Sequence, residues 1–216
     1  MNVQPSASEA ACTLTRPHGR DDCEIMATMQ NDPSNINPVA ATRKTMDAET
    51  LAFAQRIIEL VRQGDAQTLG PLFDRGLPAN LRNGKGDSML MLASYHGHFD
   101  VARILLEHGA DPEVSNDNGQ TPIAGAAYKG DLPMVKLLLE HGAHVEGMGP
   151  DGKTALMFAA MFNRTEVVPV LLAHGADIDA RNSKGMSALD LANTMGAAAA
   201  AAQLTEAGRT PSATKR

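Results

Sequence analysis

Apolar and small residues recur at a constant interval of 33 residues from about Asp47 to the C-terminal region of the chain. Leucine pairs occupy one register of this pattern, and single alanines and glycines occupy others. These positions are Leu105-Leu106, Leu138-Leu139 and Leu171-Leu172; Ala93, Ala126, Ala159 and Ala192; and Gly86, Gly119, Gly152 and Gly185. Self-similarity at a fixed period is typical of repeat proteins. The pattern therefore predicts that one small structural unit is repeated along the chain.

Residues within each interval predict two helices separated by a tight turn. Thr121 provides a capping hydroxyl, and Pro122 follows at the first helical position, where its missing N–H costs nothing. Paired small residues such as Ala126-Ala127 let neighbouring backbones approach closely, and Gly130 then allows a turn. A second helix carries the leucine pair. The capping position recurs at Ser88, Thr154 and Ser187, and the second helix is expected to end at Gly109, Gly142 and Gly175.

A further glycine register contains one exception, at Asn163. This asparagine fills the position that Gly64, Gly97, Gly130 and Gly196 occupy in the other intervals. A single unit of two helices and a hairpin loop cannot bury its apolar face alone, so we expect neighbouring units to stack and to share one continuous core.

The repeated motifs resemble those of the ankyrin-repeat family. They are Gly119-Gln120-Thr121-Pro122-Ile123, Ala126-Ala127, Gly97-His98 and the run Leu105-Leu106-Glu107-His108-Gly109-Ala110-Asp111. The resemblance covers about residues 47 to 208 and implies an all-α solenoid of helix-turn-helix units joined by hairpin loops. It implies a degenerate first repeat over 47–82, three full repeats over 83–115, 116–148 and 149–181, and a C-terminal unit from 182.

The sequence departs from the family pattern inside the first helix of each repeat. Met91, Ala124, Met157 and Asp190 replace the family's histidine, so its usual side-chain network should be absent. Gly125 lies within a predicted helix and should cost about 0.5–1 kcal/mol relative to alanine.

Three regions follow from these patterns. Residues 1–45 are rich in Pro, Ser, Asn and Thr and lack helical or strand periodicity, which predicts a disordered N-terminal segment. Residues 46–208 form the predicted repeat domain, and 209–216 a disordered tail. Because Met26 and Met29 lie in the N-terminal segment, we hypothesise that translation begins at one of them instead of at Met1.

Charge and cysteine content narrow the classes of partner. The net charge of −6 and the pI near 5.6 disfavour nucleic acid and membrane as partners, and we expect a monomer.

Cys12 and Cys23 lie in the polar N-terminal segment, and reduced, incidental thiols are favoured over a disulfide. The first thirty residues contain no apolar signal region, which favours a cytoplasmic location. A secretion system that reads a disordered N-terminus would leave no such mark.

Candidate catalytic groups are few. His96 and His98 could ligate a metal, but His98 matches the turn histidine of the family. His108, His141 and His174 recur at predicted helix C-termini, where they favour the helix dipole. No phosphate-binding loop or serine nucleophile motif is present. We therefore predict no enzymatic activity and no cofactor.

Positions not needed for core or turns are candidates for partner binding. Tyr95, Tyr128 and Met161 each lie two residues after a repeated alanine, at the end of the predicted first helix of their repeat. The resemblance implies a concave surface there. The alternative is that these side chains fill gaps between repeats. The full candidate set adds the next residues His96, Lys129 and Phe162 and the hairpin residues Lys85, Asp87, Asn118, Gln120, Asp151 and Lys153.

The sequence thus predicts a scaffold or adaptor that binds and regulates a partner protein, similar to small bacterial ankyrin-repeat proteins. Two alternatives stay open within this class. The chain could be a secreted effector that binds host proteins, or a stress-protective, enzyme-stabilising protein.

Overall fold

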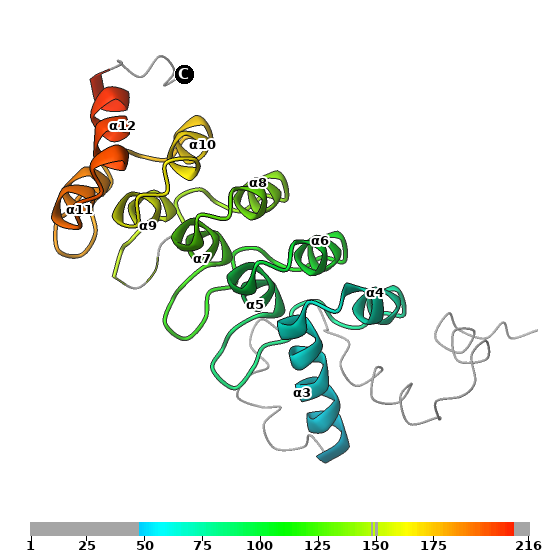
Figure 1. Ribbon diagram of the computed structural model, residues 1–216. Helices are drawn as coiled ribbons and strands as arrows, with labels where there is room; N and C mark the ends of the chain where they lie inside the picture. Colours follow the sequence, from blue (N-terminus) through cyan, green and yellow to red (C-terminus); the bar gives the residue numbers. More distant parts are fainter. Residues whose placement is uncertain (1–47, 148, 150, 210–216) are drawn as a thin grey trace, which may run out of the picture.

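The computed structural model describes residues 48–147, 149 and 151–209 (Figure 1). Ten helices in these ranges form five successive pairs, each containing two helices joined by a short turn. The pairs are α3 (Ala48–Gln63) with α4 (Ala66–Asp74), α5 (Met89–His96) with α6 (Phe99–Glu107), α7 (Pro122–Lys129) with α8 (Leu132–Glu140), α9 (Ala155–Met161) with α10 (Val167–Ala173), and α11 (Ala188–Thr194) with α12 (Ala198–Arg209).

The helix pairs stack into two layers, as the all-α solenoid prediction requires. The first helices α5, α7, α9 and α11 each contact the next along one layer, and α4, α6, α8 and α10 follow one another in the second (Figure 1). The long loops between the pairs all project from the same side of the stack, below the first layer in the view of Figure 1. Among the described residues, the hairpin loops contribute one isolated bridge, between Arg82 and Ser88.

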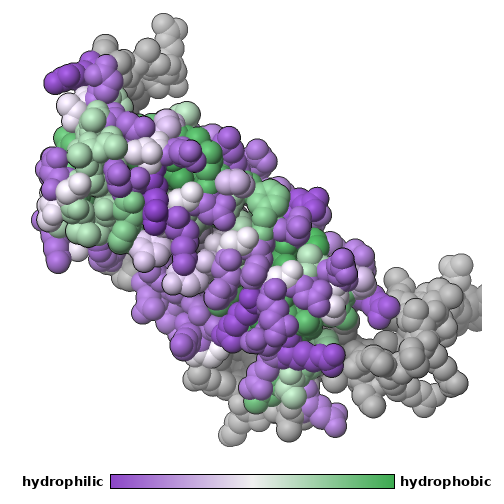
Figure 2. All heavy atoms as spheres, in the orientation of Figure 1, coloured by the Kyte–Doolittle hydropathy of each residue, from purple (hydrophilic) through white to green (hydrophobic). Residues whose placement is uncertain are grey.

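The core is continuous from the first repeat to the last. Leu105, Leu138 and Leu171 are fully buried at the same position of successive second helices. Ala93, Ala126, Ala159 and Ala192 also have no exposed surface. Their small side chains let adjacent first helices pack closely, so each repeat buries its apolar face against the next. In Figure 2, hydrophilic residues cover most of the visible face, and a pale hydrophobic area marks the alanine-rich C-terminal end.

The turn between the two helices of each repeat depends on a left-handed backbone. Gly97 and Gly130 have φ values of 76° and 80°, and Asn163 has φ of 54° at the corresponding position. Asparagine tolerates this conformation better than most residues with a side chain. Its Oδ1 atom also accepts a hydrogen bond of 3.0 Å from the backbone N–H of Ala200, which links the last two repeats.

Three of the four predicted helix caps are present. Ser88, Thr154 and Ser187 each accept a hydrogen bond from the backbone N–H three residues later, at 3.1, 3.3 and 3.2 Å. The prediction for Thr121 was wrong. Its Oγ1 atom makes no capping bond, is buried, and has no hydrogen-bond partner in the described part of the chain. The hydroxyl lies toward Gly147 of the next loop, where a β-carbon would lie 3.1 Å from it.

An asparagine clamp shapes most of the hairpin loops. The side-chain oxygens of Asn83, Asn116 and Asn182 each accept hydrogen bonds from the backbone N–H groups two and four residues later. Gly149 occupies this position in the remaining hairpin, where Asp151 and Lys153 instead form an ion pair.

Several predictions concern residues that lie outside the described ranges. These are the N-terminal segment 1–45 with Cys12, Cys23, Met26 and Met29, and the last seven residues of the predicted tail. Helix α12 includes Arg209, which was assigned to that tail.

The two threonines at equivalent caps give a matched test of the hydrogen-bond assignment. Thr154→Val should lower the free energy of unfolding by about 1 kcal/mol, because the cap bond to Met157 is lost. Thr121→Val should leave stability unchanged or raise it slightly, because an unpaired buried hydroxyl is removed without a change in volume. Urea unfolding midpoints of both variants measure this difference. Equal losses would show that the Thr121 hydroxyl is paired in solution.

Candidate partner-binding groove

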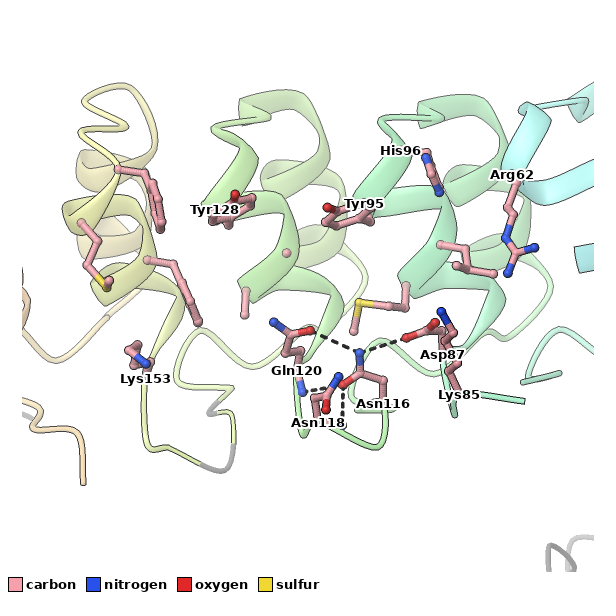
Figure 3. Close-up of a pocket in the computed structure, with 17 residues that line it drawn as sticks. Arg62, Lys85, Asp87, Tyr95, His96, Asn116, Asn118, Gln120, Tyr128 and Lys153 are labelled. Carbon is pink, nitrogen blue, oxygen red and sulfur yellow. Dashed lines mark hydrogen bonds between the residues drawn. The ribbon is translucent and has the colours of Figure 1, made fainter. Parts of the chain in front are cut away.

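A groove with a volume of about 610 Å³ crosses the first helices α5, α7 and α9 and the hairpins that precede them (Figure 3). Ten of the twelve predicted binding residues line it. They are Lys85, Asp87, Tyr95, His96, Asn118, Gln120, Tyr128, Lys153, Met161 and Phe162. Lys129 and Asp151 lie beside the groove and contact two of its lining residues, Tyr95 and Lys153 respectively.

The floor of the groove contains residues that the sequence analysis missed. Leu92, Gly125 and Phe158 occupy one register of the repeat, three positions before Tyr95, Tyr128 and Met161. Residues three apart share a helix face, so this spacing could have identified the floor from the sequence. Met91, Ala124, Asn116 and Arg62 also line the groove without having been predicted to do so.

Aromatic side chains form the upper wall in the view of Figure 3. The Tyr95 side chain is 47% exposed, and the Lys129 ammonium group lies 4.4 Å from the centre of its ring. Tyr128 is half-buried, and its ring meets that of Phe162 edge to face with centres 4.5 Å apart. Tyr95 is therefore open to a partner, whereas Tyr128 and Phe162 also pack between repeats.

A polar network along the hairpins forms the opposite wall. The side-chain amide of Asn116 donates to Asp87 at 2.9 Å and to Gln120 at 3.3 Å (Figure 3). The Asn116 oxygen accepts hydrogen bonds of 3.0 Å from the backbone N–H groups of Asn118 and Gln120. These bonds fix the hairpin tip, so the polar wall is already ordered without a ligand.

The charge of the groove differs in sign from that of the chain. Its lining contains the cations Arg62, Lys85 and Lys153 and one carboxylate, Asp87, although the chain carries a net charge of −6. The side-chain hydrogen bond from Lys153 holds the pKa of Asp151 below its ordinary value, so Asp151 stays ionised beside that lysine. Arg62 lies 3.6 Å from Glu59 in an exposed pair that water screens strongly.

The histidines have structural partners. The His98 ring nitrogen Nε2 lies 2.7 Å from the carbonyl oxygen of Arg62, at the turn of the preceding repeat. His108, His141 and His174 approach the carbonyl four residues earlier at 2.8, 2.9 and 2.8 Å, as expected at helix C-termini. Among the described residues, no group of three or more metal-ligating side chains comes together, and the His96–His98 pair has no third ligand.

Large side chains close some repeat boundaries but not all. His98 packs so closely on Gly64 that a β-carbon there would lie 2.5 Å from its ring. Arg164 packs on Gly130 in the same way and donates from Nε to the Tyr128 carbonyl at 2.9 Å. At the boundary between α5 and α7, the equivalent residue is Asp131, which instead caps its own helix by accepting from Met134.

None of the helices within the described ranges is both long and apolar enough to cross a membrane.

Comparison with known proteins agrees with the repeat architecture. A family model for three copies of the ankyrin repeat matches residues 57–148, and a model for many copies of it matches residues 138–192. A Pseudomonas aeruginosa protein, named as an ankyrin repeat protein, is 56% identical over 62 residues. The match covers 29% of this chain and 36% of that protein, so the chain spans little more than a third of this relative's length.

The environment of His96 predicts a pH-dependent stability. Partial desolvation lowers its pKa, and the neighbouring His98 and the nearby cations lower it further. The unfolded chain therefore binds this proton more tightly, and stability falls as the pH drops through the ordinary histidine value of about 6.5. Between about pH 7.5 and 5.5, the unfolding temperature of the wild type should fall more than that of His96→Gln. Parallel curves for the two proteins would contradict the assignment.

Proposed function

Because the chain belongs to the ankyrin-repeat family, we propose that it is a non-enzymatic scaffold whose groove and hairpin tips bind and regulate a partner protein. Ankyrin repeats generally mediate protein–protein interaction. The proposal adds the location of the binding surface on this chain. Residues 46–208 supply that surface, and its twelve contact residues are those predicted from the sequence.

One observation carries this proposal: Tyr95 is nearly half exposed in a groove whose neighbouring walls are ordered. Tyrosine offers a large contact area and loses little conformational entropy on binding, and aromatic residues and methionine are enriched in the cores of interfaces. Tyr128, Met161 and Phe162 continue this anchor row across the next two repeats. A row of this kind fits a protein partner better than a small molecule.

The oligomeric state, location and ligands of the protein are proposed from its sequence. The protein acts as a monomer in the cytoplasm of a bacterium, without a cofactor, nucleic acid or membrane as a ligand. A secreted effector and a stress-protective protein are the alternatives within this class. Export from the cell would distinguish the first, and the absence of a saturable partner would distinguish the second.

Substitution of the two tyrosines tests the proposal. Tyr95→Ala should leave the free energy of unfolding unchanged, and Tyr128→Ala should lower it by about 1 kcal/mol, because its contact with Phe162 is lost. The double variant should lose at least tenfold in affinity for a partner captured from native lysate, since both anchors are removed (about 1.4 kcal/mol or more). Titration calorimetry measures the affinity, and thermal unfolding measures stability.

Phe99→Ala is the matched control, because Phe99 is also an exposed aromatic residue but belongs to α6 in the second layer. It should bind like the wild type. Retained binding by the folded double variant would show that the partner contacts another surface. A large loss of stability in Tyr95→Ala would assign that ring to the core.

A further inference from the structure

Gly125 interrupts a row of large apolar side chains in the groove. The equivalent positions in three other repeats hold Leu92, Phe158 and Leu191, whereas the third repeat has no side chain there. Gly125 lies inside α7 and is not among the glycines with positive φ. A β-carbon at this position would meet a single neighbouring atom, Met91 Sδ, at an ordinary distance of 3.8 Å. The backbone and the packing thus accept alanine here.

Glycine at this site lowers stability without a structural benefit. A glycine inside a helix costs about 0.5–1 kcal/mol relative to alanine. What its small size provides is a depression in the floor of the groove. Tyr95, Tyr128, Met91 and Phe158 line the same groove around this point. The depression is thus surrounded by apolar and aromatic groups, an environment that suits an apolar side chain.

Cationic groups lie at both ends of this apolar region. Arg62 and Lys85 are at the end toward the first repeat, and Lys153 is at the end toward the fourth (Figure 3). Asp87, the one carboxylate in the lining, accepts hydrogen bonds from Asn83 and Asn116, so its charge is partly satisfied within the hairpins. Arg62 also pairs with Glu59, and Lys153 pairs with Asp151, whereas Lys85 and the adjoining Lys129 have no carboxylate partner among the described residues. These two lysines leave the groove region with a small excess of positive charge, although the whole chain is acidic.

We propose that the groove binds an extended acidic segment of a partner protein, with one apolar side chain of that segment seated over Gly125. This inference rests on the proposed function and specifies its ligand. Packed helices lie about 10 Å apart, so the three steps from α3 to α9 span about 30 Å. An extended chain advances about 3.3 Å per residue, which gives a segment of about nine residues. Its carboxylates would meet the cations at the two ends.

Selection from a library of random 12-residue peptides tests this inference directly, because the peptides stand in for the partner segment. The peptides are displayed on phage, selected on the immobilised 216-residue chain, and resynthesised for affinity measurement. We expect enriched peptides to contain more Asp and Glu than Lys and Arg and one indispensable large apolar residue. Their affinity should fall as the salt concentration rises, because salt screens charges at the groove ends.

Charge reversal tests the ends of the groove. Lys85→Glu combined with Lys153→Glu should weaken the selected peptides about tenfold or more, because two attractive contacts become repulsive. Lys136→Glu combined with Arg103→Glu is the matched control, since it changes the net charge by the same amount and both residues are exposed in the second layer, on α8 and α6. It should leave the affinity unchanged. Equal effects of the two changes would assign the salt dependence to the overall charge of the protein.

Substitutions at Gly125 test the depression itself. Gly125→Ala should raise the unfolding temperature and weaken the peptides several-fold, and Gly125→Leu should weaken them at least tenfold, by filling the space that the apolar side chain needs. Gly208→Ala is the matched control in α12, where a β-carbon would meet only Ile178 Cδ1 at 3.9 Å. It should stabilise the protein without a change in affinity.

The outcomes separate this inference from the proposed function. Peptides without an acidic bias, or peptides that tolerate Gly125→Leu, would overturn the inference, while their loss with Tyr95→Ala would still support the groove as the binding surface. Peptides insensitive to Tyr95→Ala and Gly125→Leu would count against both. Failure to enrich any peptide would overturn the proposal of an extended segment. Binding of the partner captured from lysate would then test whether the groove is the binding surface. Tighter groove binding of a 12-nucleotide poly(dT) than of any peptide would reject a protein ligand.

Discussion

The structure depends on contact between successive repeats, because no helix pair covers its own apolar face. Leu105, Leu138 and Leu171 are inaccessible to water in the stacked array. The alanines between the first helices set how closely the pairs approach, and a larger side chain there would separate them. Stability of this kind is the sum of local interfaces, so the surface residues away from those interfaces can vary without loss of the fold.

Because these surface residues can vary, a groove could form where they cluster. The turns, caps and leucines occupy most positions in every repeat, while the inner helix ends and hairpin tips vary from one repeat to the next. Tyr95, Tyr128 and Met161 occupy equivalent backbone positions. The third differs from the other two in side-chain type, and each of the three has different neighbours. Gly125 is the clearest case, since it gives up helix stability at a place where its neighbours carry large side chains. Natural proteins accept such local costs mainly where a surface has a task.

Features that repeat in the sequence were predictable, and features that depend on contacts between repeats were not. The 33-residue period identified the five helix pairs, and it assigned Asn163 to a turn that normally requires glycine. The same reasoning failed at Thr121, because the orientation of one hydroxyl depends on the adjacent loop. The groove floor follows a register of the repeat, at Leu92, Gly125 and Phe158, that is visible in the sequence. The contact between Tyr128 and Phe162 depends on the distance between two repeats, which no local pattern encodes.

The uneven boundaries between repeats have a mechanical consequence. At the helical turns, His98 ties the second repeat to the first, and Arg164 ties the fourth to the third. Between the second and third repeats, Asp131 makes its hydrogen bond within its own repeat, whereas the hairpin end is held by Asn116 and Asp87. Near the turn, this boundary is crossed by the Lys129 ammonium group over the Tyr95 ring instead of by a hydrogen bond from the residue that follows Gly130. Because Tyr95 and Tyr128 stand on opposite sides of this boundary, a small rotation between the second and third repeats would change the distance between the two rings.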